Sequence, residues 1–416
     1  MGRKIIFFII CTFFLIPSTV LASPKINSPS AILINSKSGQ VLYEKKVHDK
    51  HYPASITKVM TAILLLEEGN LEKVVTIGDD VPFLIERGSS QIYLIPGEQL
   101  TREQLLYALL VDSANDAAVA IAQDIAGSVE KFVQEMNEKA KELGTLNTNF
   151  VNPHGLHDDN HYTTAYDMAL IACEAMKNPI FRQVVKTERY IIPATNKQDT
   201  RYLYLGNRLV RNTTYRNYKY DGANGVKTGY TSKAGNTLIA SASRNDLDLI
   251  TVVLNANGNE VYEDTISLLD YGFDTFQNKI AVKKGDTIEE IHLENADQPL
   301  PLIAKDTLEY CIDRNSNQEI TWDIKLMDEL SPPIEKGDSL GTMVFSLNGV
   351  EIDSIELIAG RAIESTNAFK NLNLPIQLKW IGIVIGLFLL YRTLVYIKKR
   401  RRIRARRLFN KTRKYI

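Results

Sequence analysis

Residues 53–66 read PASITKVMTAILLL and place a lysine, Lys58, near the start of an otherwise apolar helix. A helix that is apolar on every side is expected to be buried. Burying an ammonium without a partner is costly, so a buried lysine must be paired, neutralised or put to use. Ser55 precedes Lys58 by three residues, and residues three apart share a face of a helix. The stretch therefore predicts a central helix whose first turn brings a hydroxyl to a desolvated amine.

The Ser-x-x-Lys pattern alone carries little information, because a chain of this length should contain about two by chance. The sequence contains two, and the second is Ser128 with Lys131. That second pair opens a charge-rich amphipathic segment, in which Ser128 is expected to be an ordinary helix N-cap. Only the pair at 55 and 58 enters an apolar helix, where the amine would lose its solvation and could accept a proton.

Two further stretches bear on chemistry. Ser113-Ala114-Asn115 interrupts the apolar pattern LLVDSANDAAVAIA, and Lys227-Thr228-Gly229 occurs once, directly before a strand. A cation and a hydroxyl beside a glycine, which lets a ligand approach the backbone, suit the binding of a carboxylate. In isolation each stretch has an ordinary structural explanation, a local bend for the first and a turn for the second.

Together and in this order, the three motifs resemble the signature of penicillin-recognising serine acyl-transferases. The resemblance is greatest to the D-alanyl-D-alanine carboxypeptidases among the low-molecular-mass penicillin-binding proteins, and it runs from Ser28 to the C-terminal anchor. Four further stretches match: Asn152–Leu156 (NPHGL), Tyr166–Ala169, Asp221–Thr231, and Ala234 with Gly235. The resemblance implies an α+β, β-lactamase/transpeptidase-like catalytic domain, built as an antiparallel sheet with a helical subdomain. A small all-β domain and a C-terminal transmembrane helix would follow.

The resemblance also implies roles for individual residues. Ser55 would be the nucleophile, Lys58 the base that takes its proton during acylation, and Ser113 a proton relay. Attack on a peptidoglycan stem peptide ending in D-Ala-D-Ala would release D-alanine, and water would then hydrolyse the acyl-enzyme. No cofactor and no metal is implied, and β-lactam antibiotics would be covalent inhibitors.

Five residues are expected to bind the substrate. Asn115 would hold the substrate amide, Lys227 and Thr228 would bind the terminal carboxylate, and Gly229 would let the substrate approach. The oxyanion hole would use the backbone N–H groups of Ser55 and Tyr230. Family members often carry an arginine after the last strand of the catalytic domain, but Asn255–Asp264 contains none and Tyr262 stands near that place.

The two ends of the chain predict export and anchoring. Residues 1–22 combine Arg3 and Lys4, an apolar stretch and a small-residue cleavage site, as a secretory signal peptide does. Residues 380–397 (WIGIVIGLFLLYRTLVYI) would span about 27 Å as a helix, near the thickness of the hydrocarbon core. The basic run that follows should stay in the cytoplasm by the positive-inside rule. The body would therefore lie on the extracytoplasmic face of the cell membrane.

We accordingly expect five regions: a signal peptide at 1–22, the catalytic domain at 23–280, a β-domain stalk at 281–370, the transmembrane anchor at 371–397 and a basic tail at 398–416. Of the 49 Lys and Arg residues, eleven lie in the tail and two in 1–22, which leaves 36 against all 49 Asp and Glu. A body with a net charge of −13 is not expected to bind nucleic acid.

The expected elements of the catalytic domain are a β-hairpin over residues 31–43, strands at 237–242 and 248–254, and helices at 55–68, 102–126, 128–143 and 167–176. From about residue 281, short alternating runs are typical of a small β domain. Lys284–Thr287 and Lys336–Ser339 have nearly the same sequence and predict one turn used twice.

Three other functions stay open. A class A β-lactamase has the same motifs and a deacylating glutamate, but here Glu142–Asn147 is one residue too long for its Glu-x-x-Leu-Asn pattern. A zinc peptidase is suggested by His154, His157 and His161 with Asp158 and Asp159. However, the resemblance places His154 in a loop that supports the active site. A non-catalytic wall-binding protein is the third possibility, although no residue required for catalysis is missing.

Overall fold

The computed structural model describes residues 23–211, 218–296, 298–315, 320–347, 349–365 and 376–412, with side chains of the last helix described for 380–404. The predicted signal peptide, at 1–22, lies outside the described residues. The described residues form two compact units. One comprises those of Met1–Ala281 and Leu308–Gln318, and the other those of Val282–Thr307 and Glu319–Ile416.

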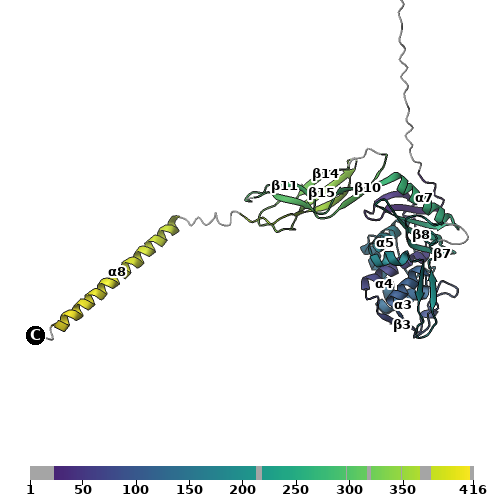
Figure 1. The fold of residues 1–416 in the computed structure, drawn as a ribbon, viewed down its shortest axis with the longest axis horizontal. Coiled ribbons are helices and arrows are strands. Elements are labelled where there is room, and N and C mark those ends of the chain that lie inside the picture. Colours follow the sequence, from purple (N-terminus) through teal and green to yellow (C-terminus); the bar gives the residue numbers. More distant parts are fainter. Residues whose placement is uncertain are drawn as a thin grey trace, which may run out of the picture. The chain divides into compact units, whose positions relative to one another are not determined.

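The first unit is built on a five-stranded antiparallel sheet in the order β2-β1-β9-β8-β7. Its strands are β1 (Ser30–Asn35), β2 (Val41–Lys45), β7 (Ala223–Thr231), β8 (Gly235–Arg244) and β9 (Leu247–Ala256). All six residues of β1 are buried, because helices cover both faces of the sheet. Helix α7 (Glu260–Thr275) lies on one face and α5 (Ala165–Lys177) on the other (Figure 1). The predicted hairpin and the two predicted strands are confirmed.

The chain between β2 and β7 forms a helical layer around α1 (Lys58–Glu68), which the sequence predicts as the central helix. Six of the seven residues from Lys58 to Leu64 are below 5% exposed. Helix α1 packs against α2 (Arg102–Val111), α3 (Asn115–Ala126), α4 (Val129–Glu142) and α5. Ser128 caps α4 by accepting a hydrogen bond from the Lys131 amide at 3.3 Å, as predicted for an ordinary N-cap. The remaining elements of the layer are η1 (Ala54–Thr57), β3 (Val74–Thr76), η2 (Val81–Phe83), β4 (Gln99–Thr101), α6 (Pro179–Val185), β5 (Arg189–Ile192) and β6 (Arg201–Tyr204).

The prediction of one continuous helix from 102 to 126 was wrong. Helix α2 ends at Val111 and α3 begins at Asn115, with Ser113 between them at φ +63°. The apolar pattern runs through the break because both helices are buried, so hydrophobic periodicity cannot reveal it. A left-handed conformation is uncommon for a serine and tends to occur at functional sites. The turn removes Ser113 from the helix and directs its side chain to the cleft described below.

A two-stranded sheet of β10 (Phe276–Val282) and β13 (Leu308–Asp313) completes the first unit. The side chain of Gln40 joins β13 by pairing with the backbone of Cys311. It accepts a hydrogen bond from the Cys311 amide at 2.8 Å and donates one to its carbonyl at 3.0 Å. Cys173 and Cys311 are both free thiols.

The second unit holds a separate five-stranded sheet in the order β11-β12-β16-β15-β14. Its strands are β11 (Thr287–Ile291), β12 (Leu300–Ala304), β14 (Ile320–Leu326), β15 (Ser339–Leu347) and β16 (Val350–Ala359). Strands β15 and β16 form a hairpin, although Asn348 of its turn lies outside the described residues. These antiparallel strands confirm the predicted all-β domain.

The two similar turns of the second unit are confirmed as one turn used twice. Gly285 and Gly337 have φ of +88° and +98°, and their amides donate to the carbonyls of Ala304 and Ala359 at 2.9 and 2.8 Å. In each turn the aspartate carboxylate accepts a hydrogen bond from the amide three residues earlier, at 2.9 Å for Asp286 and 2.8 Å for Asp338. The glycine supplies the positive φ and the aspartate closes the turn.

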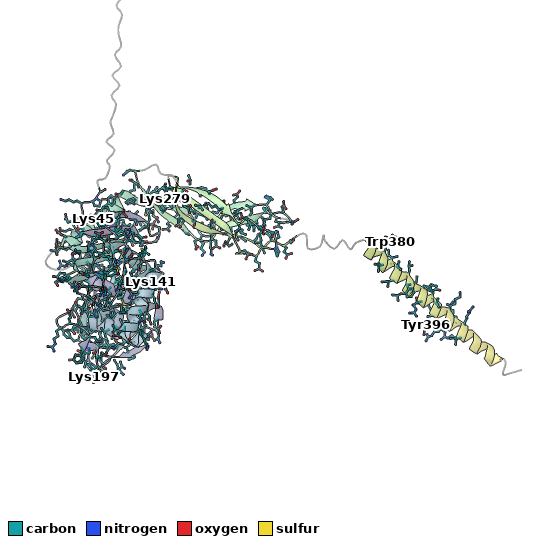
Figure 2. All side chains as sticks on the ribbon, turned by 180° about the vertical axis from the view of Figure 1, so that it is seen from behind. Lys45, Lys141, Lys197, Lys279, Trp380 and Tyr396 are labelled. Carbon is teal, nitrogen blue, oxygen red and sulfur yellow. The ribbon has the colours of Figure 1, made fainter. Side chains whose placement is uncertain are left out.

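The last element of the chain is the helix α8 (Ile376–Thr412), described by itself. Its segment Trp380–Arg404 is long and apolar enough to cross a membrane. Its described apolar side chains are exposed, from Trp380 to Ile403, and Figure 2 shows them projecting around the helix. A soluble helix would bury such a surface, so this one is suited to a lipid environment.

The N-terminal segment is fixed to the first unit by one buried carboxylate. Asp264 of α7 accepts hydrogen bonds from the amides of Asn27 and Ser28, at 3.0 and 2.7 Å, and from the Ser28 hydroxyl. We expect Asp264→Ala to lower the free energy of unfolding by about 2–4 kcal/mol, since it leaves buried donors without an acceptor. Denaturant unfolding measures this. Asp274→Ala, at an exposed position of the same helix, is the control. Equal unfolding midpoints for the two variants would contradict the assigned role.

Candidate active site

Ser55 lies in the 3-10 turn η1, directly before α1. The preceding residue, Ala54, has φ +52°, so the turn is strained and needs support. Two glycines provide room for it. A Cβ on Gly155 would lie 1.9 Å from the Ala54 carbonyl oxygen, and one on Gly229 would lie 2.8 Å from the Ser55 amide nitrogen. Close packing at these two glycines therefore fixes the position of Ser55.

Lys58 is fully buried, and its Nζ lies 3.1 Å from Ser55 Oγ. It donates hydrogen bonds to Asn115 Oδ1 at 2.6 Å and to the carbonyl of His154 at 2.8 Å. Burial, and then the nearby charge of Lys227, lower the Lys58 pKa well below its usual range, while Asp116 opposes this shift. The amine has no carboxylate in direct contact among the described residues, so the neutral form is favoured.

Asp116 positions the loop beside the site. Its buried carboxylate accepts hydrogen bonds from the amides of Ile92 and Leu94, at 3.2 and 2.9 Å. The Asn115 amide donates to the Ser90 carbonyl at 2.8 Å. The start of α3 and the loop at 90–94 are therefore held together, and this also holds Asn115 against Lys58.

Ser113 and Lys227 form a second pair. Lys227 Nζ lies 3.0 Å from Ser113 Oγ and also donates to the Thr228 carbonyl at 2.9 Å. Burial lowers the pKa of Lys227 to about 7, although Asp112 opposes this shift. The pair links β7 to the break between α2 and α3 and places an amine that can hold a positive charge at the cleft.

The two pairs meet at a cleft of about 390 Å³ between β7, the α2–α3 break and the segment after β6. Six of the residues predicted from the sequence line it: Ser55, Ser113, Lys227, Thr228, Gly229 and Tyr230. Lys58 and Asn115 are buried behind Ser55 and contact one another. Because β7 is an edge strand of the sheet, its outer edge can pair with an extended ligand backbone.

His154 takes part through its backbone. Its carbonyl accepts the bond from Lys58, whereas its ring Nδ1 accepts one from the Leu156 amide at 3.2 Å. His161 uses both ring nitrogens, for the Val151 amide and for Thr57 Oγ1. Burial lowers the pKa of the His154 ring well below its usual range and that of His161 to about 4. The described residues contain no group of three or more His, Cys, Asp or Glu side chains placed to hold a metal.

Sequence reasoning missed several residues of the cleft. Asp112 lines it and could have been noted, because an acid directly before Ser113 in an apolar pattern is unusual. Ser90, Gly206, Asn207 and Asn236 also line it but lie in stretches without a motif. They reach the cleft only through the tertiary fold.

The glutamate considered for a β-lactamase does not line the cleft. Glu142 ends α4, its side chain is 69% exposed, and it pairs with Lys139. No residue of Glu142–Asn147 is among those that line the cleft.

The segment Asn255–Asp264 lacks the expected arginine, but Arg208, from another part of the chain, contacts it. Arg208 lies 5.5 Å from the ring centre of Tyr262 and donates to the side chain of Asn259 at 3.1 Å. The Tyr262 hydroxyl lies 3.5 Å from the carbonyl of the cleft residue Gly206.

Comparison with known proteins agrees with this geometry. A family model for D-alanyl-D-alanine carboxypeptidases matches residues 18–258, and a model for the C-terminal domain of penicillin-binding protein 5 matches 276–365. The chain belongs to the D-alanyl-D-alanine carboxypeptidase family. Membership of this family of serine peptidases confirms the resemblance found in the sequence.

The alignments with individual relatives cover most of this chain and most of each relative. The chain is 36% identical over 327 residues to D-alanyl-D-alanine carboxypeptidase DacF of Bacillus subtilis, covering 77% of this chain and 82% of the relative. It is 32% identical to DacA of Escherichia coli, covering 83% and 86%. The solved structure of penicillin-binding protein 5 from Haemophilus influenzae superposes with a TM-score of 0.71 at 29% identity, covering 83% of this chain and all of that one. The fold of both units is therefore that of penicillin-binding protein 5.

The two lysines predict a pH profile for acylation of the free enzyme by benzylpenicillin. If Lys58 is the base, acylation would need its neutral form and would be gained as pH rises through the pKa of Lys58. If Lys227 binds the carboxylate of penicillin, this binding would need its charged form and would be lost as pH rises through about 7. We expect Lys227→Arg to move the alkaline limb of the second-order acylation rate constant upward by at least about one pH unit, because a guanidinium stays charged.

The control for this profile is Lys233→Arg at an exposed position near the end of β7, which should keep the wild-type limb. A Lys227→Arg profile that superimposes on that of the wild type would show that another group sets the limb.

Proposed function

We propose that the protein is a serine-type D-Ala-D-Ala carboxypeptidase that removes the terminal D-alanine from peptidoglycan stem peptides. The observation that carries the proposal is the pairing of Ser55 with a buried Lys58, which contacts no carboxylate among the described residues, beside a cleft that also holds Lys227 and Ser113. The family of the chain supports the same reaction.

The contacts of Lys58 support its role as the base. A neutral amine has two N–H donors and one lone pair. The carbonyl of His154 and Oδ1 of Asn115 only accept hydrogen bonds, so they occupy both donors. The lone pair is then left for the Ser55 hydroxyl, 3.1 Å away. Ser55 would lose its proton to Lys58 as it attacks the carbonyl carbon, and Ser113 would relay a proton to the departing amine.

The cleft also supports the substrate-binding roles. Lys227 and Thr228 would bind the terminal carboxylate, and Asn115 would hold the substrate amide. The backbone N–H groups of Ser55 and Tyr230 would stabilise the oxyanion. Tyr230 lines the cleft, so its backbone N–H lies close enough to the site for this role. Water would complete the cycle by hydrolysing the acyl-enzyme.

We further propose that the body is exported and stays tethered. The supports are the signal-like sequence at 1–22 and the candidate span Trp380–Arg404, followed by a basic tail. With this topology, the catalytic domain at 23–280 and the β domain at 281–370 would lie outside the membrane. The anchor at 371–397 would hold them near newly made peptidoglycan, and the tail at 398–416 would stay inside.

Labelling of intact cells with a fluorescent penicillin tests the proposal. We expect the wild type to be labelled in the membrane fraction and Ser55→Ala to show no label. Lys58→Ala should be labelled at least about 10²-fold more slowly, because it lacks the base. Purified wild type should release D-alanine from a peptide ending in D-Ala-D-Ala and keep a penicillin adduct in its intact mass.

Ser128→Ala is the matched control, since Ser128 begins the other Ser-x-x-Lys pattern but only caps α4. It should be labelled like the wild type. Label that persists in Ser55→Ala would refute the proposed nucleophile. Rapid loss of the adduct would indicate a β-lactamase, and failure to release D-alanine would indicate a wall-binding protein.

A further inference from the structure

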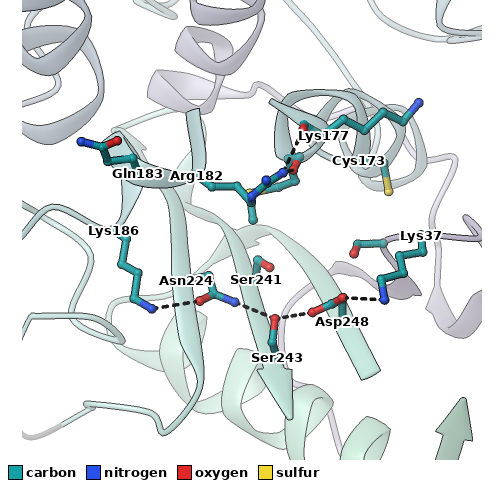
Figure 3. A pocket seen from close by; sticks show the side chains of 12 residues that line it. Lys37, Cys173, Lys177, Arg182, Gln183, Lys186, Asn224, Ser241, Ser243 and Asp248 are labelled. Atoms are coloured by element: carbon teal, nitrogen blue, oxygen red, sulfur yellow. Dashed lines mark hydrogen bonds and ion pairs between the residues drawn. The ribbon is translucent and has the colours of Figure 1, made fainter. Parts of the chain in front are cut away.

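A second cavity, of about 740 Å³, lies in the first unit away from the cleft. It is enclosed by the end of α5, by α6, by the β1–β2 turn and by strands β7, β8 and β9 (Figure 3). Its lining contains four basic side chains, Lys37, Lys177, Arg182 and Lys186, and one acidic side chain, Asp248. A basic cavity in a body with an excess of acidic residues needs an explanation.

Two of the four cations are already neutralised. Lys37 lies 3.3 Å from Asp248 and 3.5 Å from Glu309, and Lys177 lies 2.8 Å from Glu174. Because both lysines already form ion pairs at the margin of the cavity, they leave little charge for a ligand.

The other two cations have only neutral partners in the described part of the chain. Arg182 donates to the carbonyls of Met176 and Lys177, at 2.6 and 2.8 Å, and Lys186 Nζ lies 3.4 Å from Asn224 Oδ1. Neither forms an ion pair among the described residues. Lys186 directly follows the last residue of α6 and lies four residues after Arg182, and both side chains line the same cavity.

The inner wall of the cavity is polar and carries the hydroxyl groups of Ser241 and Ser243, of which only Ser243 forms side-chain hydrogen bonds among the described residues. Ser241 and Ser243 lie on the same face of β8, two residues apart. Ser243 accepts a hydrogen bond from Asn224 at 2.8 Å and donates to Asp248. Ser241 is 2% exposed, lines the cavity, and has no side-chain hydrogen bond among the described residues. Its hydroxyl opens into the cavity, where it can donate a hydrogen bond to water or to a ligand.

We propose that this cavity binds an anion of the phosphate-ester class, with Arg182, Lys186 and Ser241 as its donors. These donors come from α6, from the residue that follows it and from β8, so they approach a ligand from different directions. A tetrahedral phosphate accepts hydrogen bonds in three dimensions, whereas a planar carboxylate accepts them close to one plane. The volume leaves room for a polar group esterified to the phosphate.

The site is distinct from the cleft and does not depend on the proposed peptidase activity. Asn224 of its wall precedes Lys227 by three residues on β7, so the two sites are separated by about 10 Å along the strand. The ligand has two possible sources for a protein at a membrane surface. It is either a soluble or wall-borne phosphate ester or the headgroup of an anionic phospholipid.

Calorimetric titration of the full chain in neutral detergent micelles with glycerol 1-phosphate tests the site. Wild type should bind saturably, and Arg182→Gln/Lys186→Gln should bind at least about tenfold more weakly, as expected for the loss of hydrogen bonds to charged groups. Ser241→Ala, which keeps both charges, should weaken binding about threefold or more. The denaturant unfolding midpoint verifies that each variant is folded.

The matched control is Lys131→Gln/Lys141→Gln, which removes the same charge from exposed positions of α4 and leaves the basic tail unchanged. It should bind like the wild type. Equal losses in the two double variants, no saturable binding by the wild type, or acetate binding as tight as that of glycerol phosphate would each overturn the proposal. Vesicles of phosphatidylglycerol distinguish the source. Vesicle binding that depends on Arg182 and Lys186 indicates a lipid headgroup, and vesicle binding independent of them indicates the non-lipid ester.

Discussion

The active site depends on the exclusion of water from the side-chain amine of Lys58. Lys58 has lost its water, and two oxygens from distant parts of the chain hold its N–H groups, the carbonyl of His154 and the side chain of Asn115. A charged lysine would need a carboxylate at this depth, whereas a neutral one needs only acceptors for its donors. The helices around α1 keep water away from this contact. The glycines at 155 and 229 then let Ser55 lie against the amine without moving the backbone.

A second buried lysine, Lys227, affects the protonation state of Lys58. Burial lowers the pKa of both lysines; the charge of Lys227 lowers that of Lys58 further, whereas Asp112 partly opposes the shift at Lys227. The two amines therefore favour different protonation states in one cleft, with Lys58 neutral and Lys227 more readily charged. Environments that separate the pKa values of nearby groups suit them to different tasks, here the base and the carboxylate-binding group that we propose.

Much of this site could be predicted from the sequence, because its chemistry is concentrated in three short motifs. Ser55 with Lys58 stood out since a lysine in an apolar helix is costly, and Lys227-Thr228-Gly229 stood out before a strand. The break at Ser113 could not be predicted, because the helices on both sides are buried and their apolar pattern is continuous. The role of the His154 carbonyl also has no sequence signal, since every residue has a carbonyl. Arg208 reaches Tyr262 only through the fold of a loop distant in sequence.

The most direct test of the account is the charge of Lys58 itself. Carbon-13 NMR of lysine-labelled protein reports it through the Cε shift, with Lys58→Met assigning the resonance. The account predicts that Lys58 shows the shift of a neutral amine at pH 8, where the exposed lysines are still charged. A Lys58 resonance that stays in the charged position and titrates with the exposed lysines would contradict the account, because Ser55 would then have no base.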